Sequence, residues 1–300
     1  MSIITITGDL ASGKSLVAKQ IAAQLGAVYF STGLIQREIA SNYTMTTLEL
    51  NQYSETHPEI DQEIDDRVRM LSDRDEGLVV DSRMAWHFLP HSFKVFLSTN
   101  IVRAAERVIA DTERSSEPVY KDRSDAMLKL QERKRSENKR YWQLYNADCA
   151  KMSNFDLVVD TTYSVPNDSI RTIIAGLDDW RRNRPIHRYW YAPRSLLPLR
   201  AFRERATDRT ARTQETVQVL LCKGNPYAFG GYDRLVDALR EGSAYLPVDV
   251  LAADDERMPD GCTANEFVEN AYRTDILAEW EQEFDFKYLA LSGPFGEPQA

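Results

Sequence analysis

Residues 8–15, with the sequence GDLASGKS, constrain the fold of this chain more than any other stretch. They fit G-x-x-x-x-G-K-[ST], the pattern of a phosphate-binding loop. Residues 2–7 are typical of a short β-strand, and residues 16–25 of a helix with one apolar side. A glycine turn between a strand and a helix N-terminus directs backbone N–H groups towards an anion. We therefore interpret the stretch as a site for a nucleoside triphosphate with Mg²⁺; the alternative is a chance match at a strand–helix turn.

The residues of this loop have distinct expected roles. Glycines at positions 8 and 13 permit backbone angles that a Cβ disfavours. Lys14 is expected to reach the β- and γ-phosphates, and the Ser15 hydroxyl to bind Mg²⁺. The residues expected to bind the triphosphate are Gly8, Asp9, Ala11, Ser12, Gly13, Lys14 and Ser15.

Composition excludes several classes of protein. A length of 300 residues favours two domains, and 43% hydrophobic with 28% charged residues is typical of an ordinary globular protein. The net charge of −9 argues against a chain built as a whole to coat DNA, but leaves a local basic surface open. Cys149, Cys222 and Cys262 are scattered, which favours a reducing, cytoplasmic compartment over a disulfide or zinc framework. No apolar run is long enough to cross a bilayer, and because the chain starts with an expected strand we expect no signal peptide.

Strands and helices alternate through the first part of the chain. Further strands are expected at residues 27–30, 78–80, 93–97 and 155–159. Helices are expected at residues 46–56, 58–74, 100–112, 122–152 and 167–180, with another after residue 33. This order predicts an α/β fold, a parallel sheet with helices on both faces.

Several motifs occur at compatible spacing along this region. They are Ser31-Thr32-Gly33 with Arg37, Pro58-Glu59-Ile60-Asp61, Asp81-Ser82-Arg83, residues 132–141 (ERKRSENKRY) and residues 155–161 (FDLVVDT). Together they resemble the archaeal-type cytidylate kinase-like family of P-loop kinases, over about residues 1–180. The resemblance implies a nucleoside monophosphate kinase-like fold, ATP as phosphoryl donor, a nucleotide acceptor pocket and a mobile arginine-rich lid.

The resemblance also implies roles for single residues. The acceptor nucleotide is expected to meet Thr32, Arg37, Arg83 and Arg107. The lid arginines Arg133, Arg135 and Arg140 are expected to act in catalysis with Lys14, because phosphoryl transfer depends on charge compensation. The alternative is a solvated basic helix with pairs such as Arg133–Glu137.

Two positions depart from the family pattern. Ser31 stands where the family usually has Asp, and Asp81-Ser82 where it often has Glu-Gly. Asp81 is expected either to hold Mg²⁺ with Ser15 or to act as a general base, which only a hydroxyl acceptor needs. Asp9 is a second carboxylate near this place; its alternative is a loop side chain in solvent.

The composition changes after Trp180. Arginines are dense over residues 181–212, with aromatic residues interleaved near the front of this segment. Such a segment can neutralise phosphates and stack on unpaired bases, or it can be a linker that packs on a second domain. The candidate DNA contacts are Arg188, Tyr189, Trp190, Arg194 and Arg234.

Residues 229–235, with Ala238, Leu239, Gly242 and Val248, resemble a ParB/sulfiredoxin-like fold. Gly230, Gly231 and Arg234 match a phosphate-holding turn of that family. Tyr232 and Asp233 do not match, since sulfiredoxins have Cys-His there and ParB proteins Glu-Arg, so reductase chemistry is not expected. We expect a kinase domain over residues 1–183 and a smaller α+β domain over 184–300, which includes strands at 217–221 and 246–251, a helix at 263–283 and a strand at 287–291.

These observations support three functions. We interpret the chain as an ATP-dependent kinase that phosphorylates the hydroxymethyl group of 5-hydroxymethyluracil in DNA, as phage enzymes of the P-loop kinase class do, in the host cytoplasm. The appended domain and the arginine-rich segment favour this reading, with the target base taken out of the stack. The first alternative is a CMP or dCMP kinase that makes the nucleoside diphosphate. The second is a nucleotide-dependent DNA-binding switch.

Overall fold

The computed structural model describes residues 2–111, 120–203 and 216–289. The chain forms two compact units, Met1–Val159 with Ser169–Ile186, and Asp160–Asp168 with His187–Ala300. The first unit therefore extends three residues beyond the expected boundary at 183, and residues 160–168 group with the second unit.

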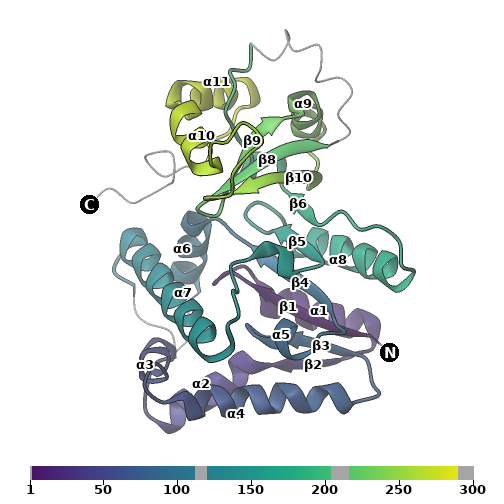
Figure 1. Cartoon of the computed structure of the whole chain (residues 1–300), viewed down its shortest axis with the longest axis vertical. Helices are drawn as coiled ribbons and strands as arrows, with labels where there is room; N and C mark the ends of the chain where they lie inside the picture. Colours follow the sequence, from purple (N-terminus) through teal and green to yellow (C-terminus); the bar gives the residue numbers. More distant parts are fainter. Residues whose placement is uncertain (1, 112–119, 204–215, 290–300) are drawn as a thin grey trace. The chain divides into compact units, whose positions relative to one another are not determined.

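The first unit is built on a parallel sheet with the strand order β2-β3-β1-β4-β5 (Figure 1). The strands are β1 (Ile3–Gly8), β2 (Val28–Ser31), β3 (Leu78–Asp81), β4 (Phe93–Ser98) and β5 (Leu157–Asp160). β1 pairs in parallel with both β3 and β4, and β2 pairs in parallel with β3. The side chains of β3 and β5 are all buried and those of β1 and β4 mostly so, as expected for strands covered on both faces, whereas β2 is exposed at Val28. The expected α/β fold with a parallel sheet is confirmed for this unit.

Eight α-helices of the described residues alternate with these strands. They are α1 (Lys14–Leu25), α2 (Thr32–Asn42), α3 (Thr47–Tyr53), α4 (Pro58–Arg69), α5 (Ala85–Phe88), α6 (Ile101–Ala110), α7 (Arg123–Tyr145) and α8 (Pro166–Arg181). Short 3-10 helices follow at Met70–Asp73 and Met152–Asn154.

Local sequence explains several helix ends. Thr46 and Glu49 form a capping box at the start of α3, and Pro58 occupies the first turn of α4, where no N–H is needed. The helix expected over 122–152 is wrong at its C-terminus, because α7 ends at Tyr145. Asn146 adopts a left-handed conformation with φ 51°, which terminates the helix.

The parallel register brings two loops together. Ile6 of β1 is paired with Asp81 at the end of β3, so the phosphate-binding loop and Asp81 leave the same edge of the sheet. This carboxyl edge is where open α/β sheets bind ligands.

The second unit contains a mixed sheet with the order β6-β10-β8-β9-β7. Its strands are β6 (Tyr189–Tyr191), β7 (Leu197–Pro198), β8 (Val217–Cys222), β9 (Asn225–Gly230) and β10 (Leu246–Ala253). β10 runs antiparallel to β6 and parallel to β8, β8 runs antiparallel to β9, and β7 runs parallel to β9. A 3-10 helix lies at Pro193–Ser195. The sequence had suggested neither β6 nor β9.

In the described part of this unit, three α-helices complete the fold: α9 (Tyr232–Glu241), α10 (Ala264–Ala271) and α11 (Thr274–Phe284). The single helix expected over 263–283 is wrong, since Tyr272 is extended with ψ 128° and separates α10 from α11. Residues 287–289 form no strand; residues 290 and 291 lie outside the described residues. Trp280 is fully buried and donates its indole N–H to the Arg200 carbonyl at 2.9 Å. The unit is α+β; its ParB/sulfiredoxin likeness stays a prediction.

Within the described ranges, no helix combines the length and the apolar character that crossing a membrane requires.

Candidate active site

The phosphate-binding loop packs tightly against β4. A Cβ on Gly8, whose φ is +153°, would lie 2.2 Å from the Leu97 carbonyl oxygen. The Asp9 N–H donates to the same carbonyl at 2.9 Å. Gly13 has φ +83° and caps α1. Close approach to β4 and the left-handed cap therefore explain the two glycines of the motif.

Two polar side chains of the loop lack an anionic partner. Ser12 is 2% exposed, and its hydroxyl has no hydrogen-bond partner among the residues that the structure describes. Lys14 Nζ donates to the carbonyls of Gly8 at 3.2 Å and Asp9 at 2.7 Å. Desolvation, with the nearby Arg83 cation, lowers the pKa of Lys14 to about 7. A buried hydroxyl normally has a partner, so the loop fits the phosphate groups that its sequence predicts.

The Asp81 carboxylate accepts hydrogen bonds from three hydroxyl groups. Its Oδ2 accepts from Ser15 Oγ at 2.6 Å, Tyr29 OH at 3.1 Å and Ser31 Oγ at 3.4 Å. Asp81 is 6% exposed. Hydroxyl and carboxylate oxygens suit Mg²⁺, which is usually held by one or two protein groups together with phosphates. Ser15 and Asp81 therefore fit the expected metal site, and Ser31 supports the carboxylate.

Arg83 joins the loop to helix α7, which carries the arginines expected to form a lid. Its Nη1 donates to the Gly8 carbonyl, and its Nε forms an ion pair with Glu137 Oε2 at 3.0 Å. Glu137 Oε1 accepts from Arg133 Nε, also at 3.0 Å. Burial alone would raise the pKa of Glu137, but Arg83 and Arg133 outweigh it and lower the pKa to about 2. The expected helix pair Arg133–Glu137 is thus present, but it belongs to a larger network.

A second ion pair ties the loop to α7. Lys134 Nζ lies 2.7 Å from Asp9 Oδ1, and Asp9 Oδ2 accepts from the Thr99 N–H at 3.1 Å. Desolvation of Asp9 is outweighed by Lys134, so the pKa of Asp9 is lowered. The reading of Asp9 as a side chain in solvent is therefore wrong. Sequence reasoning had not singled out Lys134, although it lies within the basic run.

A shallow hollow lies over the loop. It is lined by Thr7, Gly8, Asp9, Leu10, Arg83, Phe96, Lys134, Glu137, Asn138, Tyr141 and Cys149. Arg83, from the segment after β3, and Lys134, from α7, are the cations that line this hollow.

The three lid arginines lie in different surroundings. Arg133 is in the network with Glu137, whereas Arg135 is exposed. Arg140 is only 2% exposed and is held by Asp61 at 2.9 Å and by the Asn51 carbonyl at 2.7 Å. The structure therefore joins Arg133 to Glu137, which lines the hollow over the loop, while Arg140 joins α7 to α3 and α4.

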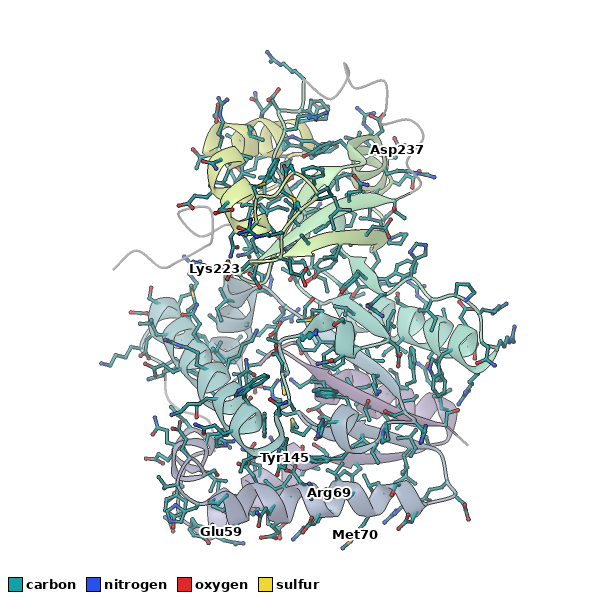
Figure 2. The ribbon with its side chains drawn as sticks, in the orientation of Figure 1. Glu59, Arg69, Met70, Tyr145, Lys223 and Asp237 are labelled. Atoms are coloured by element: carbon teal, nitrogen blue, oxygen red, sulfur yellow. The ribbon has the colours of Figure 1, made fainter. Side chains whose placement is uncertain are left out.

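A second hollow shares Arg83 and Tyr141 with the first. Its lining residues are Thr32, Gln36, Asp61, Ile64, Asp65, Ser82, Arg83, Met84 and Tyr141. Asp65 accepts from Tyr145 OH at 2.5 Å, and Figure 2 labels Tyr145 together with Arg69 of α4. Burial raises the pKa of Asp65 to about 6. Arg83 and Tyr141 line both hollows, so an acceptor here would lie beside the triphosphate.

The remaining expected acceptor contacts are spread over the first unit. Thr32 lines the second hollow and donates to the Asp81 carbonyl at 3.4 Å. Arg37 is half-buried, close to Gly33, and has no hydrogen-bond or ion-pair partner among the described residues. Arg107 donates to the Ala11 carbonyl at 3.1 Å, so it contacts the phosphate-binding loop rather than the second hollow.

The candidate DNA contacts lie in the second unit. Tyr189 and Trp190 are in β6, and the Trp190 indole donates to the His187 carbonyl at 2.9 Å. The Arg194 guanidinium lies 5.3 Å from the Phe286 ring centre. Arg188 and Arg234 are exposed. Arg205, Arg209 and Arg212 of the arginine-rich segment lie outside the described residues.

Comparison with known proteins agrees with this geometry. The model of the cytidylate kinase-like family matches residues 3–163. The chain belongs to the cytidylate kinase-like family. It is 34% identical over 178 residues to the cytidylate kinase of Halorubrum lacusprofundi, covering 59% of this chain and 89% of the relative. It is 30% identical over 172 residues to the cytidylate kinase of Pyrobaculum aerophilum, covering 57% and 90%. This family member is a P-loop kinase, a phosphotransferase, and the resemblance found in its motifs is confirmed.

Solved structures give a weaker likeness. An uncharacterized protein from Eubacterium ventriosum has a TM-score of 0.46 at 17% identity, covering 59% of this chain and 99% of that structure. Shikimate kinase from Aquifex aeolicus has a TM-score of 0.39 at 17% identity, covering 60% and 98%.

Proposed function

We propose that this kinase transfers the γ-phosphoryl group of ATP to the phosphate of CMP or dCMP, giving ADP and the nucleoside diphosphate. The observation that carries the proposal is the second hollow, where two carboxylates, Asp61 and Asp65, lie beside Arg83. The exocyclic amine of cytosine is a hydrogen-bond donor that carboxylates accept. Relatives that are about 30% identical over the same region are named cytidylate kinases.

The residues around the loop have the charges that this transfer needs. Lys14, Arg83 and Arg133 would compensate the negative charge of the phosphates, and arginine can meet phosphate oxygens in two places. Ser15 and Asp81 would hold Mg²⁺, which neutralises phosphate charge when it is bound. Arg37 is a cation with no partner among the described residues, so it suits the phosphate of the acceptor.

Transfer to the phosphate of a nucleotide is compatible with an Asp81 carboxylate that is already hydrogen-bonded. An acceptor phosphate is already an anion and needs no general base. Oδ2 of Asp81 already accepts from Ser15, Tyr29 and Ser31, which suits a metal-site carboxylate better than a free base.

Phosphorylation of 5-hydroxymethyluracil in DNA is the second candidate. The departure at Asp81 favours it, because a hydroxyl acceptor requires a base. The packing of Trp190 and Arg194 against neighbouring groups supports it less, since unpaired bases need exposed stacking surfaces. The same experiment therefore includes DNA as an acceptor.

The test is phosphoryl transfer by the full chain with ATP and Mg²⁺. CMP, dCMP, UMP, AMP and duplex DNA with and without 5-hydroxymethyluracil are offered separately. We expect CDP or dCDP to form, Lys14→Ala to abolish transfer, and Arg37→Ala to raise the KM for CMP roughly tenfold, the scale of one charge-assisted contact. Arg67→Ala is the matched control, because the one ion pair of Arg67 with a described residue is an exposed helix pair with Glu63. Phosphoryl transfer to DNA that contains 5-hydroxymethyluracil, with none to CMP or dCMP, would overturn the proposal.

A further inference from the structure

Glu137 is a buried carboxylate that the proposed transfer does not use directly. It is 4% exposed and lies on α7, facing the hollow above the phosphate-binding loop. Its Oε1 accepts a hydrogen bond from Arg133 Nε at 3.0 Å, and its Oε2 forms an ion pair with Arg83 Nε, also at 3.0 Å. These arginines come from α7 and from the segment after β3, so one carboxylate joins two elements.

The charge of Glu137 persists at all ordinary pH values. Its two arginine partners lower its pKa to about 2 despite burial. Burying a carboxylate is unfavourable unless it is well paired, and its gain in stability over an apolar group is often small. Stabilisation of the fold alone therefore explains poorly why residue 137 is a carboxylate. The orientation of two arginine side chains explains it specifically.

The geometry restricts how the two guanidinium groups are oriented. A planar guanidinium held at Nε has a fixed plane, so its remaining N–H groups have fixed directions. Arg83 also donates from Nη1 to the Gly8 carbonyl, the first residue of the loop. Without the carboxylate, two like charges would lie next to each other with nothing between them to attract both.

We propose that Glu137 is a positioning residue that holds Arg83 and Arg133 over the phosphate-binding loop, so that both meet the γ-phosphoryl group. This inference rests on the proposed function, and it states which residue orients the two arginines of the proposed site. Displacing a charge-compensating group by about 1 Å costs on the order of a hundredfold in rate.

The test compares Glu137→Gln with the wild-type full chain in transfer from ATP to CMP. Glutamine keeps one acceptor oxygen but turns an N–H₂ donor towards the other arginine. We expect kcat to fall about 10- to 100-fold, with the KM for CMP changed less than threefold. Glu137→Asp keeps the charge, and we expect it to recover part of kcat.

Glu55→Gln is the matched control. Glu55 is also a carboxylate bound to α7, through Ser136 at 2.6 Å and Lys139 at 3.3 Å, but it does not line the hollow over the loop. We expect its kcat to stay within twofold of the wild type. An equal fall in both variants would assign the effect to anchoring of α7 and overturn the proposal.

A double-mutant cycle shows whether Glu137 acts on kcat by orienting Arg133 or by stabilising the fold. If Glu137 acts through Arg133, Glu137→Gln combined with Arg133→Ala should lower kcat little more than Arg133→Ala alone. Full additivity would overturn the proposal. If Glu137→Gln does not fold, Glu137→Asp in the same cycle gives the answer.

The affinities for ATP and ADP, measured in the absence of CMP, distinguish this inference from the proposed function. Glu137→Gln should weaken ATP at least tenfold and ADP less than threefold, because the arginines address the γ-phosphoryl group. If the wild type phosphorylates no cytidine nucleotide, the proposed function fails, but the ATP-to-ADP comparison still decides the role of Glu137. Equal effects on both nucleotides would overturn that role.

Discussion

Ser15 Oγ donates a hydrogen bond to Asp81 Oδ2 at 2.6 Å, which joins the phosphate-binding loop to the end of β3. The parallel pairing of β1 and β3 brings these residues together from positions 66 apart in the sequence. A hydroxyl oxygen and a carboxylate oxygen at this distance could both face a cation with little rearrangement, and the hydroxyl would keep its proton. The pair is therefore the part of the site that a test of metal dependence should address.

Asp81→Asn should lower kcat at least tenfold and raise the Mg²⁺ concentration needed for half-maximal rate. The reason is that a neutral amide attracts the cation less than a carboxylate does, while it keeps an oxygen for the hydroxyl donors. A Mg²⁺ titration of initial rates measures both effects. Asp156→Asn is the control, since Asp156 accepts from the Lys94 N–H at 2.8 Å, away from the loop. An unchanged Mg²⁺ requirement would remove Asp81 from the metal site.

Lys14 should take up a proton when ATP binds. Its pKa is about 7 because desolvation and Arg83 disfavour the cation, so at pH 8 most molecules carry neutral Lys14. The triphosphate reverses this by stabilising the ammonium group. We expect uptake approaching one proton at pH 8 and little at pH 6, measured calorimetrically in buffers of different ionisation enthalpy.

Lys14→Arg supplies the control for proton uptake. Arginine stays charged at every working pH, so its ATP binding should show no lysine-linked uptake at pH 8. Equal uptake by both proteins would assign the proton to another group.

How far sequence reasoning reaches depends on whether a feature is local. The loop, the strands of the first unit and most helices follow from patterns within about ten to twenty residues, and the structure agrees with them, whereas β6 and β9 of the second unit did not follow from such patterns. The partner of Arg140 does not follow, because Asp61 lies 79 positions away and reaches it only after α4 and α7 pack. Tyr29 was missed as a partner of Asp81 for the same reason, since only the pairing of β2 with β3 brings them together.

Charge patterns were especially ambiguous. A run of basic residues on α7 is compatible with solvent, with phosphate or with buried acids. In the structure Arg135 is exposed, whereas Arg133 and Arg140 pair with the buried acids Glu137 and Asp61. The choice depends on which side of the helix meets α3 and α4, which no local spacing reveals.

Arg140→Ala should destabilise the fold by roughly 3–5 kcal/mol, because it leaves the buried Asp61 carboxylate without its cation. Equilibrium denaturation with urea measures the loss. Arg135→Ala, an exposed position on the same helix, should change the free energy of unfolding by less than about 0.5 kcal/mol. A small effect at Arg140 would mean that water or rearranged side chains replace the ion pair.

Asp65 should make the fold less stable as pH rises through its pKa. Burial raises this pKa from 3.8 to about 6, and Tyr145, Asp61, Arg69 and Asp66 also act on it. The folded state therefore binds more protons than the unfolded state between pH 4 and 6, so stability falls over this interval by up to roughly 3 kcal/mol.

Asp65→Asn should remove the loss of folding stability that the wild type shows between pH 4 and 6. The amide oxygen still accepts from Tyr145 OH, but nothing ionises, so the variant should gain stability relative to the wild type as pH rises from 4 to 7. Urea denaturation at each pH measures the difference. Asp66→Asn controls for charge alone, because Asp66 is exposed on the same helix and pairs with Arg69 at 2.6 Å. A constant difference between Asp65→Asn and wild type would contradict the prediction.

Gly231→Ala should destabilise the second unit by more than about 2 kcal/mol. Gly231 has φ +73°, and a Cβ there would lie 2.5 Å from the Thr216 carbonyl oxygen, a backbone atom that cannot rotate away. Gly242 has φ +66° with nothing within 4 Å of its Cβ position, so Gly242→Ala carries only the conformational cost, about 1 kcal/mol. Urea denaturation, followed by fluorescence of the buried Trp280, measures both. Equal losses would mean that the turn before α9 needs glycine for its conformation alone, and that β8 can move to make room.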